Sequence, residues 1–223
     1  MPLYKYLPRQ YADALLVMGT IRVGTLFDFR KTEHARGVAD SSEGTRTILA
    51  LPDREIITED QAEKDAFFGM MGARVHGKIT VPRGVRFVHK QTSTDHFIFC
   101  ASTELSSRVQ AEFEATDACV EINDISGFLY ELTRALNAVA PVRFDGIHEV
   151  QYTGRTQEQT LTRFQDFNPA HGLHPGLIKD PSFRRQKELR AIWSPISAML
   201  PEPIITSSRH LPQYCRDVSA GIA

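Results

Sequence analysis

Two polar side chains near the C-terminal end of the chain are spaced so that they could act together on a bound molecule. Gln186 and Glu188 stand two residues apart at the start of a strand-like run that ends at Trp193. Alternate residues of a strand face the same side, so both side chains are predicted to project together. A carboxylate accepts hydrogen bonds and offsets positive charge, while an amide both donates and accepts. Spacing alone favours the simpler interpretation that Glu188 is an ion-paired residue of a basic surface strand.

Two other strand-like segments carry polar groups. Lys5 lies between two tyrosines in the strand predicted over residues 3–7, and the apolar run over residues 97–101 ends in the hydroxyls of Ser102 and Thr103. Each also has a structural interpretation, because a lysine on a terminal strand is usually solvated and a serine can simply end a strand.

Several common motifs for catalysis, metal binding or phosphate binding are missing. The sequence contains no Walker-type phosphate loop, Gly-x-Gly-x-x-Gly, His-Glu-x-x-His, Cys-x-x-Cys or Gly-x-Ser-x-Gly. His171 and His174 lie three residues apart in a loop rich in glycine and proline. Two histidines could bind zinc, but no third ligand stands at a suitable spacing, so we expect no metal site.

The elements that must position these residues alternate irregularly between strands and helices, which favours an α+β fold over a regular βαβ repeat. Residues 9–18 predict a helix with Tyr11, Leu15 and Met18 on one face, and Gly19 ends it. The strands that follow are predicted over residues 20–29, 74–81, 85–89, 96–101, 118–122, 144–152 and 189–193.

Other segments are predicted to be helices or loops. Residues 126–140 are the clearest helix, since their apolar side chains share one side, and residues 156–167 and the acidic segment 53–65 are also expected to be helical. Residues 30–46 hold almost no large apolar side chains, so they form a long loop. Loops of that length are usually functional or disordered.

Composition limits the class of protein. The 223 residues fit a single domain over 1–223, and 26 basic against 27 acidic residues give a net charge of −1. The whole chain is therefore no general polyanion binder, although a local basic patch is compatible with this balance. Three scattered cysteines, the absence of an export signal and the absence of an apolar run of about 18 residues predict a cytoplasmic protein without a membrane span.

The order of the polar segments resembles the ADP-ribosyltransferase superfamily, and within it the bacterial and phage-associated branch that begins with Leu-Tyr-Lys-Tyr. That family places a basic residue on its first strand, hydroxyls at the end of a central strand, and Gln-or-Glu-x-Glu near its end. The matching residues are Lys5, then Ser102 and Thr103, then Gln186 and Glu188, within a likeness over residues 3–193. Many relatives carry arginine or histidine on the first strand, and lysine lacks the bidentate fork of arginine.

The resemblance implies a split antiparallel sheet around a site for NAD, whose bond between nicotinamide and ribose is broken. Glu188 is implied to be catalytic, accepting a hydrogen bond from the ribose 2′-hydroxyl and stabilising positive charge on the sugar. Gln186 is implied to face the acceptor, and glutamine in this position favours amide side chains or nucleobases over arginine. The residues implied to hold NAD are Lys5, Tyr6, Arg30, Arg36, Ser102 and Thr103.

The resemblance also implies partners. It indicates a mono-ADP-ribosyltransferase whose acceptor is a macromolecule, with RNA or DNA slightly favoured over protein. Residues 74–90 carry lysine and arginine without any acid, and residues 179–190 are also mainly basic, which suits NAD phosphates or a nucleic-acid backbone. Small relatives often serve as toxins or in phage defence, so a neutralising antitoxin protein is an expected partner.

Two other interpretations stay open. One is a catalytically inactive module of the same fold that binds NAD, ADP-ribose or nucleic acid without turnover. The other is a nuclease-like or hydrolase-like enzyme that uses the loop with His171 and His174.

Overall fold

The computed structural model describes residues 1–31, 39–170, 172–196 and 200–222. Its strands are mainly antiparallel and its helices few, which confirms the α+β class expected from the sequence. The sequence predicted one domain over residues 1–223, and within this span the chain forms two compact units. Unit 1 comprises Met1–Gly44, Thr94–Thr153 and Gly176–Ala223, and unit 2 comprises Thr45–Ser93 and Gly154–Pro175.

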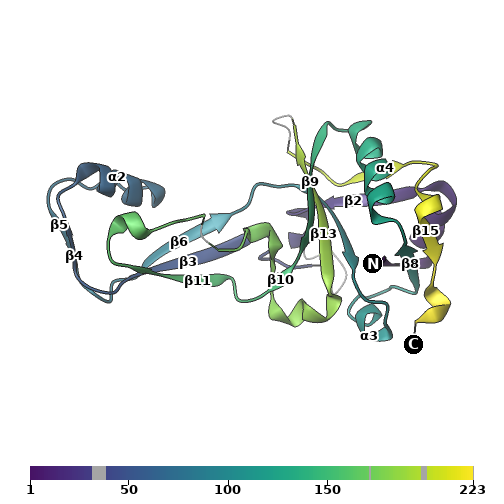
Figure 1. Ribbon diagram of the computed structural model, residues 1–223, viewed down its shortest axis with the longest axis horizontal. Helices are drawn as coiled ribbons and strands as arrows, with labels where there is room; N and C mark the ends of the chain where they lie inside the picture. Colours follow the sequence, from purple (N-terminus) through teal and green to yellow (C-terminus); the bar gives the residue numbers. More distant parts are fainter. Residues whose placement is uncertain (32–38, 171, 197–199, 223) are drawn as a thin grey trace. The chain divides into compact units, whose positions relative to one another are not determined.

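Unit 1 is built on an eight-stranded sheet in the order β14-β2-β7-β1-β8-β15, with β13 paired to β7 and to β9. Figure 1 shows most of these strands with their labels. They are β1 (Leu3–Leu7), β2 (Thr20–Thr25), β7 (Phe97–Ser102), β8 (Ala118–Ile122), β9 (Val142–Glu149), β13 (Glu188–Pro195), β14 (Ile204–Ser207) and β15 (Cys215–Asp217). Two short strands, β10 (Gln151–Tyr152) and β12 (Ile178–Lys179), form a separate parallel pair.

The central strand β7 has different neighbours along its two edges. On one edge β13 pairs continuously, from Glu188 opposite Ser102 to Trp193 opposite Phe97. On the other edge β1 pairs with the C-terminal end of β7, and β2 pairs with its N-terminal end. Among the described residues, the middle of this second edge has no strand partner, so β1 and β2 leave a gap between them.

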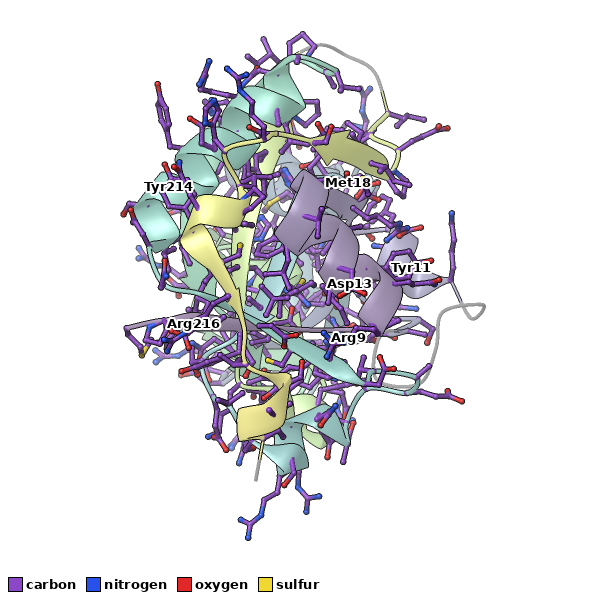
Figure 2. The ribbon with its side chains drawn as sticks, turned by 90° about the vertical axis from the view of Figure 1, so that its right-hand side faces the viewer. Arg9, Tyr11, Asp13, Met18, Tyr214 and Arg216 are labelled. Atoms are coloured by element: carbon purple, nitrogen blue, oxygen red, sulfur yellow. The ribbon has the colours of Figure 1, made fainter. Side chains whose placement is uncertain are left out.

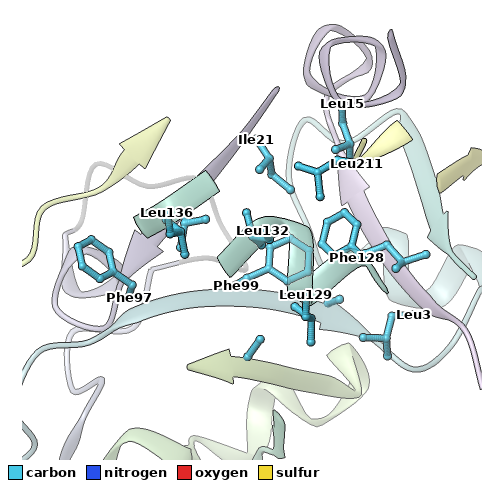
Figure 3. Close-up of a cluster of buried hydrophobic side chains, with 14 of the residues drawn as sticks. Leu3, Leu15, Ile21, Phe97, Phe99, Phe128, Leu129, Leu132, Leu136 and Leu211 are labelled. Atoms are coloured by element: carbon cyan, nitrogen blue, oxygen red, sulfur yellow. The ribbon is translucent and has the colours of Figure 1, made fainter. Parts of the chain in front are cut away.

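The helix α4 (Ile125–Asn137) supplies a large part of the core of unit 1, and it confirms the helix predicted over residues 126–140. Its apolar residues recur at helical spacing and pack on side chains of β7. This cluster, drawn in Figure 3, includes Phe128, Leu132 and Leu136 of the helix and Phe97 and Phe99 of the strand. Another helix of the unit, α3 (Ser107–Gln110), is short.

The segment between β1 and β2 is helical as predicted, but it buries a different face. Ala12 and Leu15 are buried, whereas Tyr11 and Met18 are 57% and 59% exposed and lie at the surface (Figure 2). A π-helical turn winds more widely than an α-helix, so the spacing that placed Met18 on the buried face does not apply. The elements are α1 (Arg9–Asp13) and a π-helical turn (Ala14–Met18), which ends at Gly19.

Unit 2 is built on a three-stranded sheet in the order β11-β3-β6, with an aromatic cluster against one face. The ring of Phe67 lies at the centre of this cluster, with its centroid 4.6 Å from that of Phe164 and 4.9 Å from that of Phe87. The elements of the unit are β3 (Thr45–Pro52), β4 (Ile56–Thr58), α2 (Gln61–Met70), β5 (Ile79–Val81), β6 (Phe87–Thr92) and β11 (Thr156–Leu161).

Three sequence predictions for unit 2 differ from the structure, and one of them is the strand expected over residues 74–81, which forms only over Ile79–Val81. Residues 156–161 form the strand β11 and not a helix, because their backbone pairs in parallel with β3 along its length. Such pairing overrides local propensity in a polar segment. The helix expected within residues 53–65 begins only at Gln61, where the Asp60 carboxylate caps the free backbone N–H groups of Ala62 and Glu63.

The loop predicted over residues 30–46 is shorter than expected, because β3 begins at Thr45. It follows a 3₁₀ turn at Asp28–Arg30, and Arg36 lies outside the described residues. None of the helices in the described parts of the chain has the length and apolar character that crossing a bilayer requires.

Candidate active site

Unit 1 contains a cavity of about 830 Å³ beside the gap between β1 and β2. Its wall comes from β1, from α1 and the turn after it, from β2, and from β7 between Ile98 and Ser102. Most of the lining is apolar, and a few charged or polar groups converge in it, as in pockets that bind small molecules. These groups include Lys5, Arg22, Ser102, Lys179, Gln186, Glu188 and Arg190.

Glu188 lies in this cavity as the first residue of β13, directly opposite Ser102 of β7. Its side chain is 7% exposed, and each carboxylate oxygen accepts a hydrogen bond from a cation. Lys179 Nζ donates to Oε2 at 2.7 Å, and Arg190 Nε donates to Oε1 at 2.6 Å. Burial by itself raises the pKa of Glu188, but the charges and hydrogen bonds of Arg190 and Lys179 outweigh it and hold that pKa well below its ordinary value. The carboxylate is therefore ionised at neutral pH.

Gln186 meets Glu188 as predicted, but not through the alternation of a strand. The strand begins only at Glu188, and Gln186 ends a 3₁₀ turn, Pro181–Gln186. Between them Lys187 adopts a left-handed conformation, with φ of +48°. This reversal brings both side chains to one ammonium group, since Lys179 Nζ also donates to Gln186 Oε1 at 2.7 Å.

Arg190 links the site to the turn that precedes β3. Its Nη1 and Nη2 each donate to a carboxylate oxygen of Glu43 at 2.9 Å, and Nη1 also donates to the Gly176 carbonyl at 2.6 Å. Arg190 and Glu43 are both 1% exposed. A fully buried arginine is held here by a bidentate pair, which is the strongest geometry available to it.

Lys5 occupies the gap in the sheet. Its Nζ donates to the Cys100 carbonyl at 2.7 Å and lies 5.0 Å from the centre of the Phe99 ring. Burial lowers the pKa of Lys5, while the charge of Glu188 acts in the opposite direction. The ammonium thus takes the place of a neighbouring strand at the middle of β7, and it lines the same cavity as Glu188.

Of the two hydroxyl residues predicted from the sequence, Ser102 lines the cavity and Thr103 does not. Ser102 is buried, and its Oγ both donates to the Glu104 carbonyl and accepts from the Glu104 N–H. The N–H and Oγ of Thr103 donate to the Lys187 carbonyl at 3.0 and 3.3 Å. Thr103 therefore holds the left-handed residue in place.

The other predicted residues have structural partners. Tyr6 lines the cavity, but its ring stacks on Phe113 and its hydroxyl bonds the backbone of Glu104 and Ser106. Burial raises the pKa of that hydroxyl to about 12. Arg30 lies outside the lining, and its Nε donates to the Glu43 carbonyl at 2.6 Å.

Sequence reasoning gave no role to three residues of the network around Glu188. They are Lys179 and Arg190, which bond its carboxylate, and Glu43, which bonds Arg190. Strand alternation was a signal for Arg190, because it follows Glu188 by two residues and shares its side of β13. A fourth residue, Tyr152, accepts the N–H of Glu188 at 2.7 Å, and no feature of the sequence pointed to it.

The described residues contain no group of three or more histidine, cysteine, aspartate or glutamate side chains arranged to hold a metal ion. His171, one of the pair considered from the sequence, lies outside those residues.

Comparisons of the chain with protein-family models, with curated proteins and with solved structures found no match. The resemblance to ADP-ribosyltransferases therefore rests on the sequence motifs alone.

Proposed function

We propose that this protein is an NAD-dependent mono-ADP-ribosyltransferase with the cavity of unit 1 as its active site. One observation carries the proposal. The residues that match the three dispersed motifs, Lys5, Ser102 and Glu188, line a single cavity although they are far apart in the chain. If the motif matches were coincidental, there would be no reason for these three residues to line the same cavity.

The size and chemistry of the cavity support a dinucleotide substrate. Its volume of about 830 Å³ lies within the range of sites for small molecules and cofactors. The cations Lys5 and Arg22 are suited to phosphate oxygens, and the apolar walls suit the flat faces of the bases. The gap that β1 and β2 leave along one edge of β7 supports a split sheet of the kind that the resemblance implies.

In the proposed reaction the bond between the ribose carbon and the nicotinamide nitrogen breaks, and its electron pair leaves with nicotinamide. The sugar carbon becomes positively charged, and the ionised Glu188 stabilises that charge and accepts a hydrogen bond from the 2′-hydroxyl. A nucleophilic atom of the acceptor then bonds to the same carbon and releases its proton. Lys179 and Arg190 keep the carboxylate ionised and fix its position.

The acceptor proposed is a macromolecule, with a nucleic acid slightly favoured over a protein amide. Gln186 presents an amide beside Glu188 and suits an acceptor that both donates and accepts hydrogen bonds. A cytoplasmic role as a toxin or in phage defence, with a neutralising antitoxin protein, belongs to the same proposal.

A second candidate is a module that binds NAD or ADP-ribose without turnover. It is favoured by the two hydrogen bonds that already occupy the carboxylate oxygens of Glu188. A carboxylate neutralised in this way is a weaker partner for a cationic sugar than one with a free oxygen.

Nicotinamide release from labelled NAD tests the first candidate against the second. We expect Glu188→Gln to lower the rate on the order of 10²–10³-fold. Glu121→Gln is the matched control, because Glu121 is also buried in this sheet and paired with an arginine, but does not line the cavity. Equal rates for wild type and Glu188→Gln would contradict the assignment, and tight NAD binding without nicotinamide release would favour the second candidate.

A further inference from the structure

The three-stranded sheet of unit 2 has one packed face and one open face. Burial alternates along β3, so that Arg46, Ile48 and Ala50 point toward the packed side. The intervening residues point to the other side, where side chains of all three strands are exposed or half-buried. Figure 1 shows β3, β6 and β11 side by side.

The open face carries hydroxyls in register with one cation, Lys90. One row across the sheet consists of Thr156, Thr47 and Lys90, and the next of Glu158, Leu49 and Val88. Threonines stand at further positions of the same face. They are Thr45, Thr92 and Thr160.

The segment that contains β6 carries charge of one sign, whereas β11 brings the acidic Glu158 to the same face. Every charged side chain between Asp65 and Asp95 is basic. Of these, Arg83 and Arg86 line a hollow of about 280 Å³ at one end of the sheet, together with Leu49, Leu51 and Glu158. Arg83, Arg86 and Lys90 are exposed, and none of the three has an ion-pair partner among the described residues.

We propose that this open face of unit 2 binds the sugar–phosphate backbone of a nucleic acid. Arginine, lysine and threonine are among the side chains that bond phosphate and sugar oxygens. When exposed lysine and arginine side chains bind a polyanion, they displace the counterions condensed around it. The release of these counterions favours binding. Arg86 and Lys90 are four residues apart, which corresponds to about 13 Å along an extended chain. This distance matches the length of about four stacked nucleotides of one strand.

The residues of the face also decide the mode of binding. The face has no aromatic side chain among its described residues, because Phe87 points into the packed cluster. Bases therefore have no ring to stack on, and we expect little dependence on base sequence. An acidic protein is a less suitable partner, since half-buried leucines and one valine supply no large apolar anchor.

Fluorescence anisotropy with a short labelled RNA and a labelled DNA duplex, at several salt concentrations, tests this proposal on the full chain. We expect the triple variant Arg83→Gln, Arg86→Gln, Lys90→Gln to bind more weakly than the wild type, on the order of tenfold or more. The slope of the logarithm of the binding constant against the logarithm of the salt concentration should be smaller in magnitude by about 2–3. The control triple variant Arg134→Gln, Arg143→Gln, Arg209→Gln removes the same charge from exposed positions of unit 1 and should keep wild-type affinity.

Three outcomes would overturn the proposal. They are absence of nucleic-acid binding by the wild type, an equal loss in the control triple variant, and equally tight binding of acidic polypeptide or anionic vesicles through the same three residues. If the triple variant does not fold, the single variants Arg83→Gln and Lys90→Gln should each lower the slope by about one. The proposal does not depend on the proposed reaction, because none of the three substituted residues lines the cavity of unit 1.

Discussion

Arg190 holds Glu43 through two parallel hydrogen bonds of 2.9 Å, and with its remaining Nε it holds Glu188 at 2.6 Å. The guanidinium therefore joins the candidate catalytic carboxylate to the turn before β3. All three side chains are buried, so each charge depends on the others for its compensation. A change at Glu43 should thus act on stability and on the site together.

Removing the charge of Glu43 should destabilise the protein strongly. Glu43→Gln leaves the buried guanidinium of Arg190 with one carboxylate in place of two, and a broken buried pair costs about 3–5 kcal/mol. Urea denaturation of variant and wild type measures this free energy of unfolding. The control is Arg9→Gln, which breaks the exposed pair with Asp217 and should cost about 0–1 kcal/mol. If both variants lose a similar free energy of unfolding, the buried network contributes no more to stability than an exposed ion pair.

Acid should destabilise the protein partly through Glu188. Its pKa is lower in the folded protein than its ordinary value of 4.5, because Arg190 and Lys179 outweigh the effect of burial. The ionised form then contributes stability that is complete above pH 4.5 and is lost as pH falls toward the folded-state pKa. We expect the free energy of unfolding to fall less steeply below pH 4.5 in Glu188→Gln than in the wild type. Identical pH profiles would contradict the lowered pKa.

At position 187, between Gln186 and Glu188, glycine should destabilise the protein less than alanine does. Lys187 has φ of +48°, and its side chain is exposed. The left-handed conformation costs about 1–2 kcal/mol for a residue with a Cβ atom. We expect Lys187→Gly to be about 1 kcal/mol more stable than Lys187→Ala, which loses the same side chain but keeps the strain. Thermal unfolding of both variants measures the difference, and a more stable alanine variant would refute the prediction.

The ammonium of Lys5 should contribute to binding of NAD. Lys5→Met keeps most of the length of the side chain but removes a charged donor, worth about 1.5–3 kcal/mol. Titration calorimetry should therefore show an affinity for NAD that is about tenfold to a hundredfold lower. Lys78→Met, at an exposed position of unit 2, is the control. Unchanged affinity in a folded Lys5→Met protein would exclude Lys5 from the NAD site.

The sequence by itself determined the local elements with strong patterns. The strand over residues 118–122 and the helix over residues 126–140 were predictable because short-range spacing of apolar residues decides which face is buried. It also predicted that Gln186 and Glu188 project together, although Gln186 lies in a 3₁₀ turn and not on the strand. It failed over residues 156–161, where a polar segment is a strand only because β3 pairs with it.

Only the tertiary structure decided how the site is held together. Lys179 and Glu43 are separated from Glu188 by turns and other strands, and no sequence spacing relates them to it. The gap in which Lys5 lies exists because β1 and β2 pair with opposite ends of β7, which is a property of sheet topology. Periodicity reports which side of its own element a residue faces, whereas the ion pairs of a buried site depend on the packing of elements distant in sequence.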